Sequence, residues 1–175
     1  MLTGQQTERL IFRKLDPQDF DECIQFFQHP LSNRYWKSEI TDSEMLCKEW
    51  IDKQMWRYLH HRGGTNILVR KDSNELIGWC GLLVQVVDDR EELEVGYSIL
   101  PAFWNKGFAT EAAKRCIDYA FENDLSESII SIIQIDNNES KRVAEKNGLV
   151  IEKQTVYHDN PVYIYRIRKK ENGSM

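Results

Sequence analysis

Apolar side chains recur every three to four residues in several stretches of the chain, which predicts amphipathic helices. The first begins after Asp16, a good N-cap that is followed by Pro17 at the first helical position, and ends at His29-Pro30. A second opens at the capping box Thr41-Asp42-Ser43-Glu44 and closes at Gly63-Gly64.

Two further helices are predicted in the second half of the chain. A long one follows Gly107, and a short one spans residues 140–147 and ends at Gly148, which suits the position just after a helix. The buried stripe of the long helix consists of small residues that allow close packing. Its members are Ala109, Ala112, Ala113, Cys116, Ile117 and Ala120.

Alternating or continuous apolar runs predict the strands. They cover residues 7–15, 65–70, 76–87, 91–100, 128–135, 149–157 and 162–168. The run 128–135 is almost entirely apolar, as expected of a strand that is covered on both faces. Because a helix separates it from 91–100, the two strands are expected to be parallel and joined by a right-handed crossover. The fold class is therefore α/β: a mixed sheet of about seven mostly antiparallel strands, one parallel pair and about four helices.

Composition fits one soluble domain. The chain has 175 residues, of which 41% are hydrophobic and 29% charged. We expect a single domain over residues 1–175, with a core from about 7 to 169 and short flexible termini that include the basic tail. No apolar run approaches the roughly 20 residues of a membrane helix, and the N-terminus lacks a signal-peptide pattern. A cytoplasmic protein without membrane partners is expected.

Net charge and cysteine spacing limit the classes of ligand and metal that the protein is expected to bind. The net charge of −5 argues against nucleic-acid binding and suits a cationic molecule or basic peptide end. Cys23, Cys47, Cys80 and Cys116 form no CxxC pair, and three of them fall on apolar helix faces. Buried free thiols and no metal site are predicted.

The stretch FWNKGFATEA, residues 103–112, places one glycine at a strand-to-helix junction. The first amides of a helix have no partner inside it, and the helix dipole favours an anion there. The amides from Asn105 to Thr110 can face a diphosphate if Gly107 lets the backbone approach, and Lys106 adds a positive charge. Neither the nucleotide-triphosphate loop nor the dinucleotide fingerprint is present, and a glycine that merely relieves a tight turn is the plain alternative.

The strand before this junction, ELEVGYSIL, alternates strictly. Glu92 and Glu94 share one face with Gly96 and Ser98. A glycine within a strand often marks a bulge or a place where another group approaches the backbone. If the parallel strands part near Gly96, their unpaired backbone groups open a slot beside the two carboxylates.

EVGYSILPAFWNKGFATEA and IDNNESKRVAEKNGLV together resemble the GNAT acetyltransferases. The stronger likeness is to the branch that includes bacterial enzymes acetylating the N-termini of ribosomal proteins. The resemblance implies the acyl-coenzyme A N-acyltransferase fold from about residue 7 to residue 169. It also implies that acetyl-coenzyme A is the acetyl donor.

The resemblance assigns the cofactor contacts. The family's pyrophosphate loop, Arg/Gln-x-x-Gly-x-Gly/Ala, maps onto residues 104–109, with Trp104 in place of the usual Arg or Gln. The backbone of Ser98, Ile99 and Leu100 is expected to pair with the pantetheine arm as an added strand would. Asn137 matches an asparagine that contacts this arm. The full set of expected cofactor residues is Ser98, Ile99, Leu100, Trp104, Asn105, Lys106, Gly107, Phe108, Ala109, Thr110 and Asn137.

Amine acetylation needs a proton acceptor, because the attacking amine must be neutral. Glu94 is the predicted catalytic base, with Glu92 as the substitute on the same face. A backbone N–H near Ile99 is the expected oxyanion donor. The family often protonates the leaving thiolate with a Tyr, whose place here is Ala144. Ser140, or a water molecule, is then the predicted acid.

The sequence predicts direct transfer of an acetyl group to a primary amine in a ternary complex. The acceptor stays open among a protein N-terminus, a polyamine, an antibiotic and a metabolite, and family habit allows a homodimer. One alternative is a non-catalytic acyl-coenzyme A-binding module, suggested by Ala144. The other is a nucleotide-binding phosphotransferase, which would need a paired Asp/Asn set for Mg²⁺ and a glycine loop that the sequence lacks.

Overall fold

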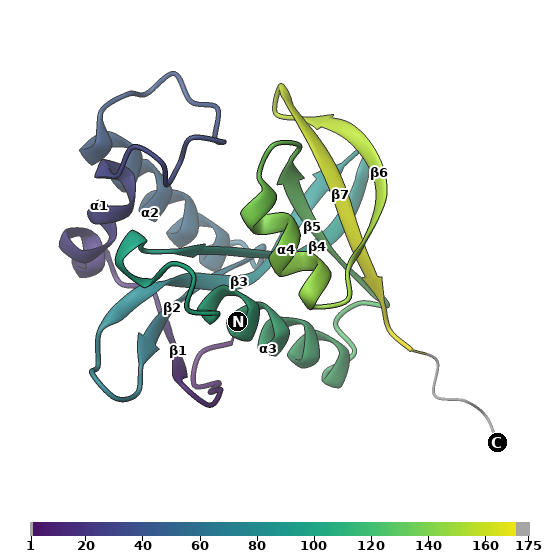
Figure 1. Ribbon diagram of the computed structural model, residues 1–175, viewed down its shortest axis with the longest axis horizontal. Helices are drawn as coiled ribbons and strands as arrows, with labels where there is room; N and C mark the ends of the chain where they lie inside the picture. The colour runs from purple at the N-terminus through teal and green to yellow at the C-terminus, as the bar shows by residue number, and fades with distance from the viewer. Residues whose placement is uncertain (1, 171–175) are drawn as a thin grey trace.

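The computed structural model describes residues 2–170 and places seven strands in one sheet (Figure 1). Their order is β1-β2-β3-β4-β5-β7-β6, and only β4 and β5 are parallel. The strands are β1 (Leu10–Lys14), β2 (Gly63–Arg70), β3 (Leu76–Val87), β4 (Arg90–Ile99), β5 (Ser128–Gln134), β6 (Val150–Tyr157) and β7 (Asn160–Arg168). The predicted mixed sheet with one parallel crossover is confirmed. Residues 171–175 of the predicted flexible tail lie outside the described residues.

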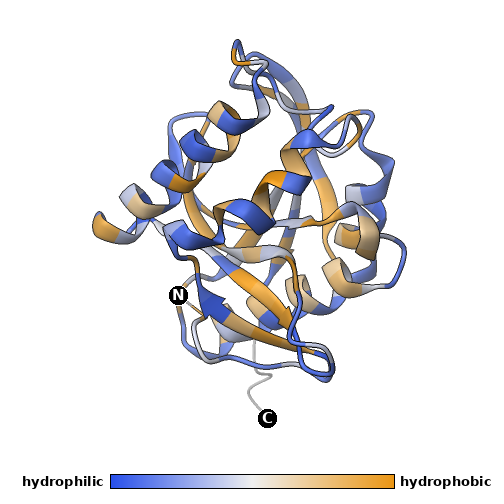
Figure 2. Ribbon diagram, turned by 90° about the vertical axis from the view of Figure 1, so that its left-hand side faces the viewer, coloured by the Kyte–Doolittle hydropathy of each residue, from blue (hydrophilic) through white to orange (hydrophobic). Residues whose placement is uncertain are grey.

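Four α-helices and two 3-10 turns complete the fold of residues 2–170. They are η1 (Pro17–Asp19), α1 (Phe20–Gln28), α2 (Ser43–Leu59), η2 (Pro101–Phe103), α3 (Phe108–Glu122) and α4 (Asn138–Lys146). Helices α1 and α2 pack on one face of the first strands, where Cys23, Phe27 and Ile51 meet Trp79. Helices α3 and α4 share the other core, and Figure 2 shows the orange strands enclosed between helices of mixed colour.

Several helix ends differ by a few residues from the prediction because the capping residue differs. The carboxylate of Asp16 caps the short turn η1, so the α-helix begins only at Phe20. Asp42, not Thr41, caps α2 by accepting from the Met45 amide at 2.8 Å. Asn137 caps α4 by accepting from the Ser140 amide at 3.0 Å, which starts that helix at Asn138.

The prediction that Gly63-Gly64 closes α2 is wrong. The helix ends at Leu59, and the glycine pair begins β2. Gly63 has φ +72°, and a Cβ there would lie 2.1 Å from the Leu82 carbonyl oxygen on β3. Close approach between strands, and not helix termination, therefore requires this glycine.

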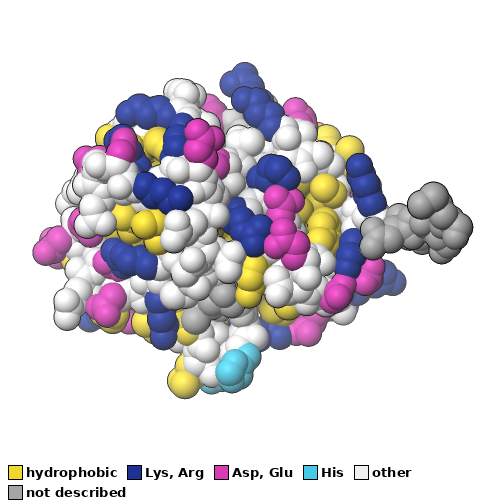
Figure 3. Space-filling model, turned by 90° about the horizontal axis from the view of Figure 1, so that it is seen from below, with side chains coloured by type: hydrophobic (Ala, Val, Ile, Leu, Met, Phe, Trp, Pro, Cys, Tyr) yellow, Lys and Arg dark blue, Asp and Glu magenta, His cyan; other side chains and the backbone are white. Residues whose placement is uncertain are grey.

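The four cysteines are free and buried, as predicted. Within residues 2–170, no group of His, Cys, Asp and Glu side chains is arranged to hold a metal ion. No helix in this part of the chain has the length and apolar character to cross a membrane. Seen from below, basic and acidic side chains are interspersed over the surface (Figure 3).

Candidate active site

The sheet opens between its two parallel strands. Strands β4 and β5 pair at one position, Glu94 with Ile130, whereas β3 pairs with β4 from Gly78–Ile99 to Val87–Arg90. Beyond Glu94, the C-terminal half of β4 therefore has a neighbour on one side only. We call this space, between residues 95–99 of β4 and the facing part of β5, the β4–β5 gap. It corresponds to the slot that the sequence suggested.

The ladder decides which backbone groups face the gap. The Leu100 amide donates to the Ile77 carbonyl at 2.8 Å, so alternate residues of β4 turn their backbone toward β3. The backbone groups of Val95, Tyr97 and Ile99 consequently face β5, and the Ser131 hydroxyl reaches from β5 to the Val95 carbonyl at 3.3 Å.

This alternation corrects one expectation. The Leu100 amide, predicted to pair with a pantetheine arm, is already bonded to β3, and Ser98 has its backbone partner in Trp79 of β3. Ile99 alone of the three directs its backbone into the gap. Its carbonyl accepts the Trp104 indole Nε1–H at 2.7 Å, which leaves the Ile99 amide for a ligand.

The loop between β4 and α3 exposes a row of amides. Asn105 and Gly107 adopt left-handed conformations, with φ 60° and 81°, and Gly107 is the N-cap of α3 without a side-chain cap. Among the described residues, no hydrogen bond uses the amides of residues 105–110 as donors. Asn105, Lys106 and Gly107 are exposed, Ala109 and Thr110 are half-buried, and Phe108 is buried. Free donors at a helix N-terminus form an anion site by geometry and by dipole.

A charged clamp from the N-terminal segment holds this loop. The Arg9 guanidinium donates to the Lys106 carbonyl at 3.0 Å and pairs with Glu111 in the first turn of α3 at 2.6 Å. The Thr7 hydroxyl and the Arg9 amide also donate to Glu111. These contacts fix the turn before α3 from outside the loop, and they lower the pKa of Glu111 against the effect of its burial.

Glu94 lies at the base of the β4–β5 gap. Its Oε2 accepts from the Gln85 side-chain amide at 2.7 Å, and its Oε1 accepts from the Ile132 backbone amide at 3.3 Å. In a continuous parallel ladder the Ile132 amide would bond to a β4 carbonyl. Burial raises the pKa of Glu94 above its ordinary value of 4.5, and the donors and the charge of Arg57 oppose that rise.

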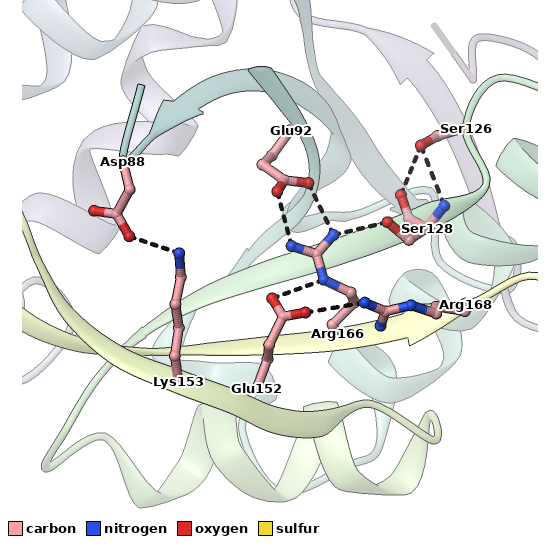
Figure 4. Close-up of polar contacts among 8 residues, drawn as sticks. All are labelled: Asp88, Glu92, Ser126, Ser128, Glu152, Lys153, Arg166 and Arg168. Atoms are coloured by element: carbon pink, nitrogen blue, oxygen red, sulfur yellow. Dashed lines mark hydrogen bonds and ion pairs between the residues drawn. The ribbon is translucent and has the colours of Figure 1, made fainter. Parts of the chain in front are cut away.

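The Glu92 carboxylate forms an ion pair, unlike that of Glu94. Its carboxylate receives two hydrogen bonds, of 2.8 and 2.9 Å, from the Arg166 guanidinium on β7 (Figure 4). Arg166 also donates to Glu152 at 2.8 Å and to Ser128 at 2.7 Å, and its side chain is 9% exposed. This bidentate bond occupies both oxygens of the Glu92 carboxylate, so Glu94 is the better candidate base.

The predicted acid lies across the gap, on α4. Ser140 is half-buried, and its carbonyl accepts the Tyr97 hydroxyl at 3.0 Å. Asn137 precedes the helix, and its side-chain oxygen is the cap, which leaves its NH₂ group free of partners among the described residues. Ala144 is buried at 2% exposure within the core, so the helix carries no phenol at the usual family place.

The segment between α1 and α2 crosses toward the second half of the sheet. The Tyr35 hydroxyl donates to the Asp136 carbonyl at 3.1 Å, and Asn160 in the β6–β7 hairpin donates to the Tyr35 carbonyl at 2.7 Å. Trp36 packs on Phe26 and Phe27 and is 45% exposed. Tyr157 reaches Gln85 beside Glu94.

A family model described as an acetyltransferase (GNAT) domain matches residues 9–150. The chain belongs to the GNAT acetyltransferase family. The Bacillus subtilis N-acetyltransferase YoaA, itself uncharacterized, is 29% identical over 170 residues, which span 94% of this chain and 96% of YoaA. As a member of this family, the chain is an N-acetyltransferase.

Solved GNAT structures share the fold. An acetyltransferase from Agrobacterium tumefaciens superposes with a TM-score of 0.79 at 22% identity and covers 94% of each chain. RimL, a ribosomal L7/L12 alpha-N-protein acetyltransferase in complex with coenzyme A, gives a TM-score of 0.73 at 14% identity, with 94% of this chain and 97% of RimL covered.

Four residues of the candidate site were not predicted from the sequence: Arg9, Arg57, Gln85 and Glu111. Arg57 is a buried arginine in α2, 7% exposed, and no local pattern predicts that burial. Gln85 interrupts an apolar strand, which is a detectable signal of a buried polar role. Glu111 in the first turn after Gly107 reads as an ordinary dipole-favoured acid.

Proposed function

We propose that this protein transfers an acetyl group from acetyl-coenzyme A directly to a primary amine, with both substrates bound together. The observation that carries the proposal is the row of unpartnered amides from residue 105 to residue 110, next to a gap that holds a buried carboxylate. The donor side has the geometry for a diphosphate and an extended arm, and the carboxylate supplies the proton acceptor.

In this proposal the pyrophosphate lies on the amides of residues 105–110, with Lys106 beside it. The Lys106 ammonium donates to the Ala102 carbonyl at 2.9 Å, lies 5.3 Å from the centre of the Phe103 ring and has no carboxylate partner among the described residues, so it is available to a phosphate. The pantetheine arm takes the place of the missing neighbour of β4 and bonds to the backbone of Ile99 and to the Asn137 amide group. Trp104 acts by fixing the Ile99 carbonyl.

Glu94 removes the proton from the attacking amine. An amine with a pKa near 10.4 is about 0.04% neutral at pH 7, which corresponds to roughly 4–5 kcal/mol. The neutral amine attacks the thioester carbonyl, the developing oxyanion is stabilised by a backbone N–H of Tyr97 or Ile99, and the C–S bond then breaks. One such donor contributes about 10²–10³ in rate. The thiolate takes a proton from Ser140 or from water.

The alternative that Ala144 suggests, a non-catalytic acyl-coenzyme A-binding module on the same fold, is disfavoured by the family to which the chain belongs. The two candidates differ in one measurement: the release of free thiol from acetyl-coenzyme A with a panel of primary amines. The panel contains peptide N-termini, polyamines, amino-sugar antibiotics and small metabolite amines. Amine-dependent thiol release supports the enzyme, whereas binding of coenzyme A without release by any amine supports the module.

Glu94→Gln tests the base. We expect near-normal affinity for coenzyme A and a kcat reduced by about 10²-fold or more at neutral pH, because the loss of a general base costs this much. At high pH, where the amine is neutral in solution, kcat is expected to recover in part. Unchanged turnover at neutral pH would assign the base elsewhere.

A cytoplasmic location, one domain over the whole chain and a homodimer stay predictions.

A further inference from the structure

Gln85 on β3 lies between the Glu94 carboxylate and a buried guanidinium. Its Nε2 donates to Glu94 Oε2 at 2.7 Å, and its Oε1 accepts from Arg57 Nη2 at 2.9 Å and from the Tyr157 hydroxyl at 3.1 Å. Because two donors meet Oε1, the amide cannot turn around without breaking both bonds. The donating end of Gln85 is therefore directed at Glu94.

Arg57 is an expensive residue to bury on α2. It is 7% exposed, and its Nη1 donates to the carbonyls of Arg62 and Val84 at 3.2 and 3.1 Å. Its Nε is buried without a partner among the described residues. A buried guanidinium costs several kcal/mol of desolvation, and an apolar side chain would join α2 to the sheet more cheaply. Arg57 forms no direct ion pair among the described residues, and its guanidinium is linked to the Glu94 carboxylate through Gln85.

We propose that Gln85 and Arg57 are positioning residues that hold Glu94 ionised and oriented toward the amine. This inference rests on the proposed function of Glu94 as the base. Gln85 fixes the carboxylate by a direct hydrogen bond, and Arg57 fixes Gln85 and supplies the compensating positive charge. Tyr157, from the hairpin on the other half of the sheet, closes the network.

Opposing effects act on the Glu94 carboxyl group. Burial raises its pKa, whereas the hydrogen bonds from Gln85 and Ile132 and the charges of Arg57 and Lys53 lower it. The other titratable groups facing it are the phenols of Tyr97 and Tyr157, whose own pKa values are raised by burial. Without Gln85 or Arg57, burial is less well opposed, and the pKa of Glu94 must rise further.

The experiment is the pH profile of kcat/KM for the best amine of the panel, measured for the wild type, Gln85→Leu and Arg57→Met. A hydrogen bond to a charged group is worth enough to shift a pKa by about one unit or more. We expect the acidic limb of each variant to move upward by about one pH unit or more, with about tenfold lower kcat/KM on that limb. KM for acetyl-coenzyme A should stay unchanged, because neither side chain touches the loop 104–110.

Gln54→Leu is the matched control. Gln54 lies one turn before Arg57, is 3% exposed and accepts from the Thr65 amide and hydroxyl at 3.0 and 3.2 Å. Its removal deletes a buried amide from the same helix without touching Glu94, so the acidic limb should stay in place. Arg57→Lys keeps the charge without the fork and should shift the limb less than Arg57→Met.

A second readout does not depend on activity: the titration of the Glu94 carboxyl followed by ¹³C NMR, assigned with Glu94→Gln. An upward shift in Gln85→Leu supports the proposal even where Arg57→Met fails to fold. An unmoved carboxyl titration and pH limb in Gln85→Leu would overturn it while leaving Glu94 as the base. A wild-type acidic limb that survives in Glu94→Gln would instead refute the proposed function itself.

Discussion

Two glutamates on one face of β4 have different environments. Glu92 receives a bidentate bond from Arg166, whereas Glu94 receives single bonds from the amides of Gln85 and Ile132. The first carboxylate is held as the partner of a cation, and the second keeps lone pairs for a proton. The same residue type, two positions apart, is thus structural in one case and a candidate base in the other.

The burial of Glu94 predicts how the stability of the fold depends on pH. The pKa of Glu94 in the folded state is raised above 4.5, its value in the unfolded chain. The folded state therefore binds the proton more tightly, and stability falls as pH rises from 4.5 through the folded pKa. Glu94→Gln carries no such charge. We expect its melting temperature to exceed that of the wild type above this window and to match it below pH 4.5.

Melting temperatures of both proteins between pH 4 and pH 8 check this expectation. A Glu94→Gln variant that is less stable than the wild type at pH 8 would contradict a desolvated carboxylate at this position. It would indicate that the network around Gln85 stabilises the charge more than burial destabilises it.

Gly107 permits a second prediction, because the chain contains a close match to it. Gly107 has φ +81° with its nearest Cβ neighbour at 3.5 Å, and Gly148 has φ +82° with its nearest at 3.5 Å. A valine at either site is strained by about 1–2 kcal/mol, so both variants should lose similar stability. Only Gly107→Val should abolish binding of coenzyme A, measured by calorimetry. Equal affinities in the two variants would show that the loop does not bind the diphosphate.

At the scale of elements, the segment before β1 and the first turn of α3 together position the loop that carries the free amides. The loop before α3 and the first turn of α3 supply the free amides, and the chain around Arg9 holds this loop through Glu111 and the Lys106 carbonyl. The Arg9 side chain is 43% exposed, so its ion pair contributes little to stability by itself. Its contribution is expected in the order of the loop.

Arg9→Met should therefore weaken coenzyme A binding by about tenfold, equivalent to about 1.4 kcal/mol, with a small change in melting temperature. Arg115→Met is the control, since Arg115 makes comparable bonds on the same helix, to Glu122 and Gln5, away from the loop. Isothermal titration of both variants with coenzyme A decides the matter. Loss of affinity in Arg115→Met to the same degree would point to a general effect on α3.

At the scale of the whole molecule, the gap divides one sheet into two parts that must be held together elsewhere. The backbone contributes one paired position between β4 and β5. Side-chain bonds connect the two parts on the N-terminal side of Glu94. Arg166 on β7 joins Glu92 on β4 to Glu152 on β6, and Lys153 pairs with Asp88 at 2.6 Å (Figure 4). These bonds join β4, β6 and β7 beside the β4–β5 gap.

Arg166→Met should lower the free energy of unfolding by about 3–5 kcal/mol, because it leaves the partly buried Glu92 carboxylate unpaired and leaves Glu152 with Arg168 alone. Adding Glu92→Gln should recover part of this loss. Arg168→Met is the control: its side chain is 67% exposed and shares only Glu152, so a change within about 1 kcal/mol is expected. Urea unfolding measures all three, and a loss below 1 kcal/mol in Arg166→Met would refute the fastening role.

The sequence by itself determined the elements and the position of the free amides at the start of α3. Apolar spacing placed the strands and helices to within a few residues, because burial on one face imposes its period on the local sequence. The left-handed glycine before α3 and the free amides after it are also local properties, since a helix N-terminus leaves its first donors unpaired wherever it occurs.

Only the tertiary structure decided which groups serve the carboxylate in the gap. Glu92 and Glu94 are equivalent in the sequence pattern, and Arg166 on β7 distinguishes them. Gln85 and Arg57 lie on other elements, and no local period records that their side chains meet Glu94. Long-range register sets these contacts, and the free energy of a buried charge depends on every partner that the folded chain brings to it.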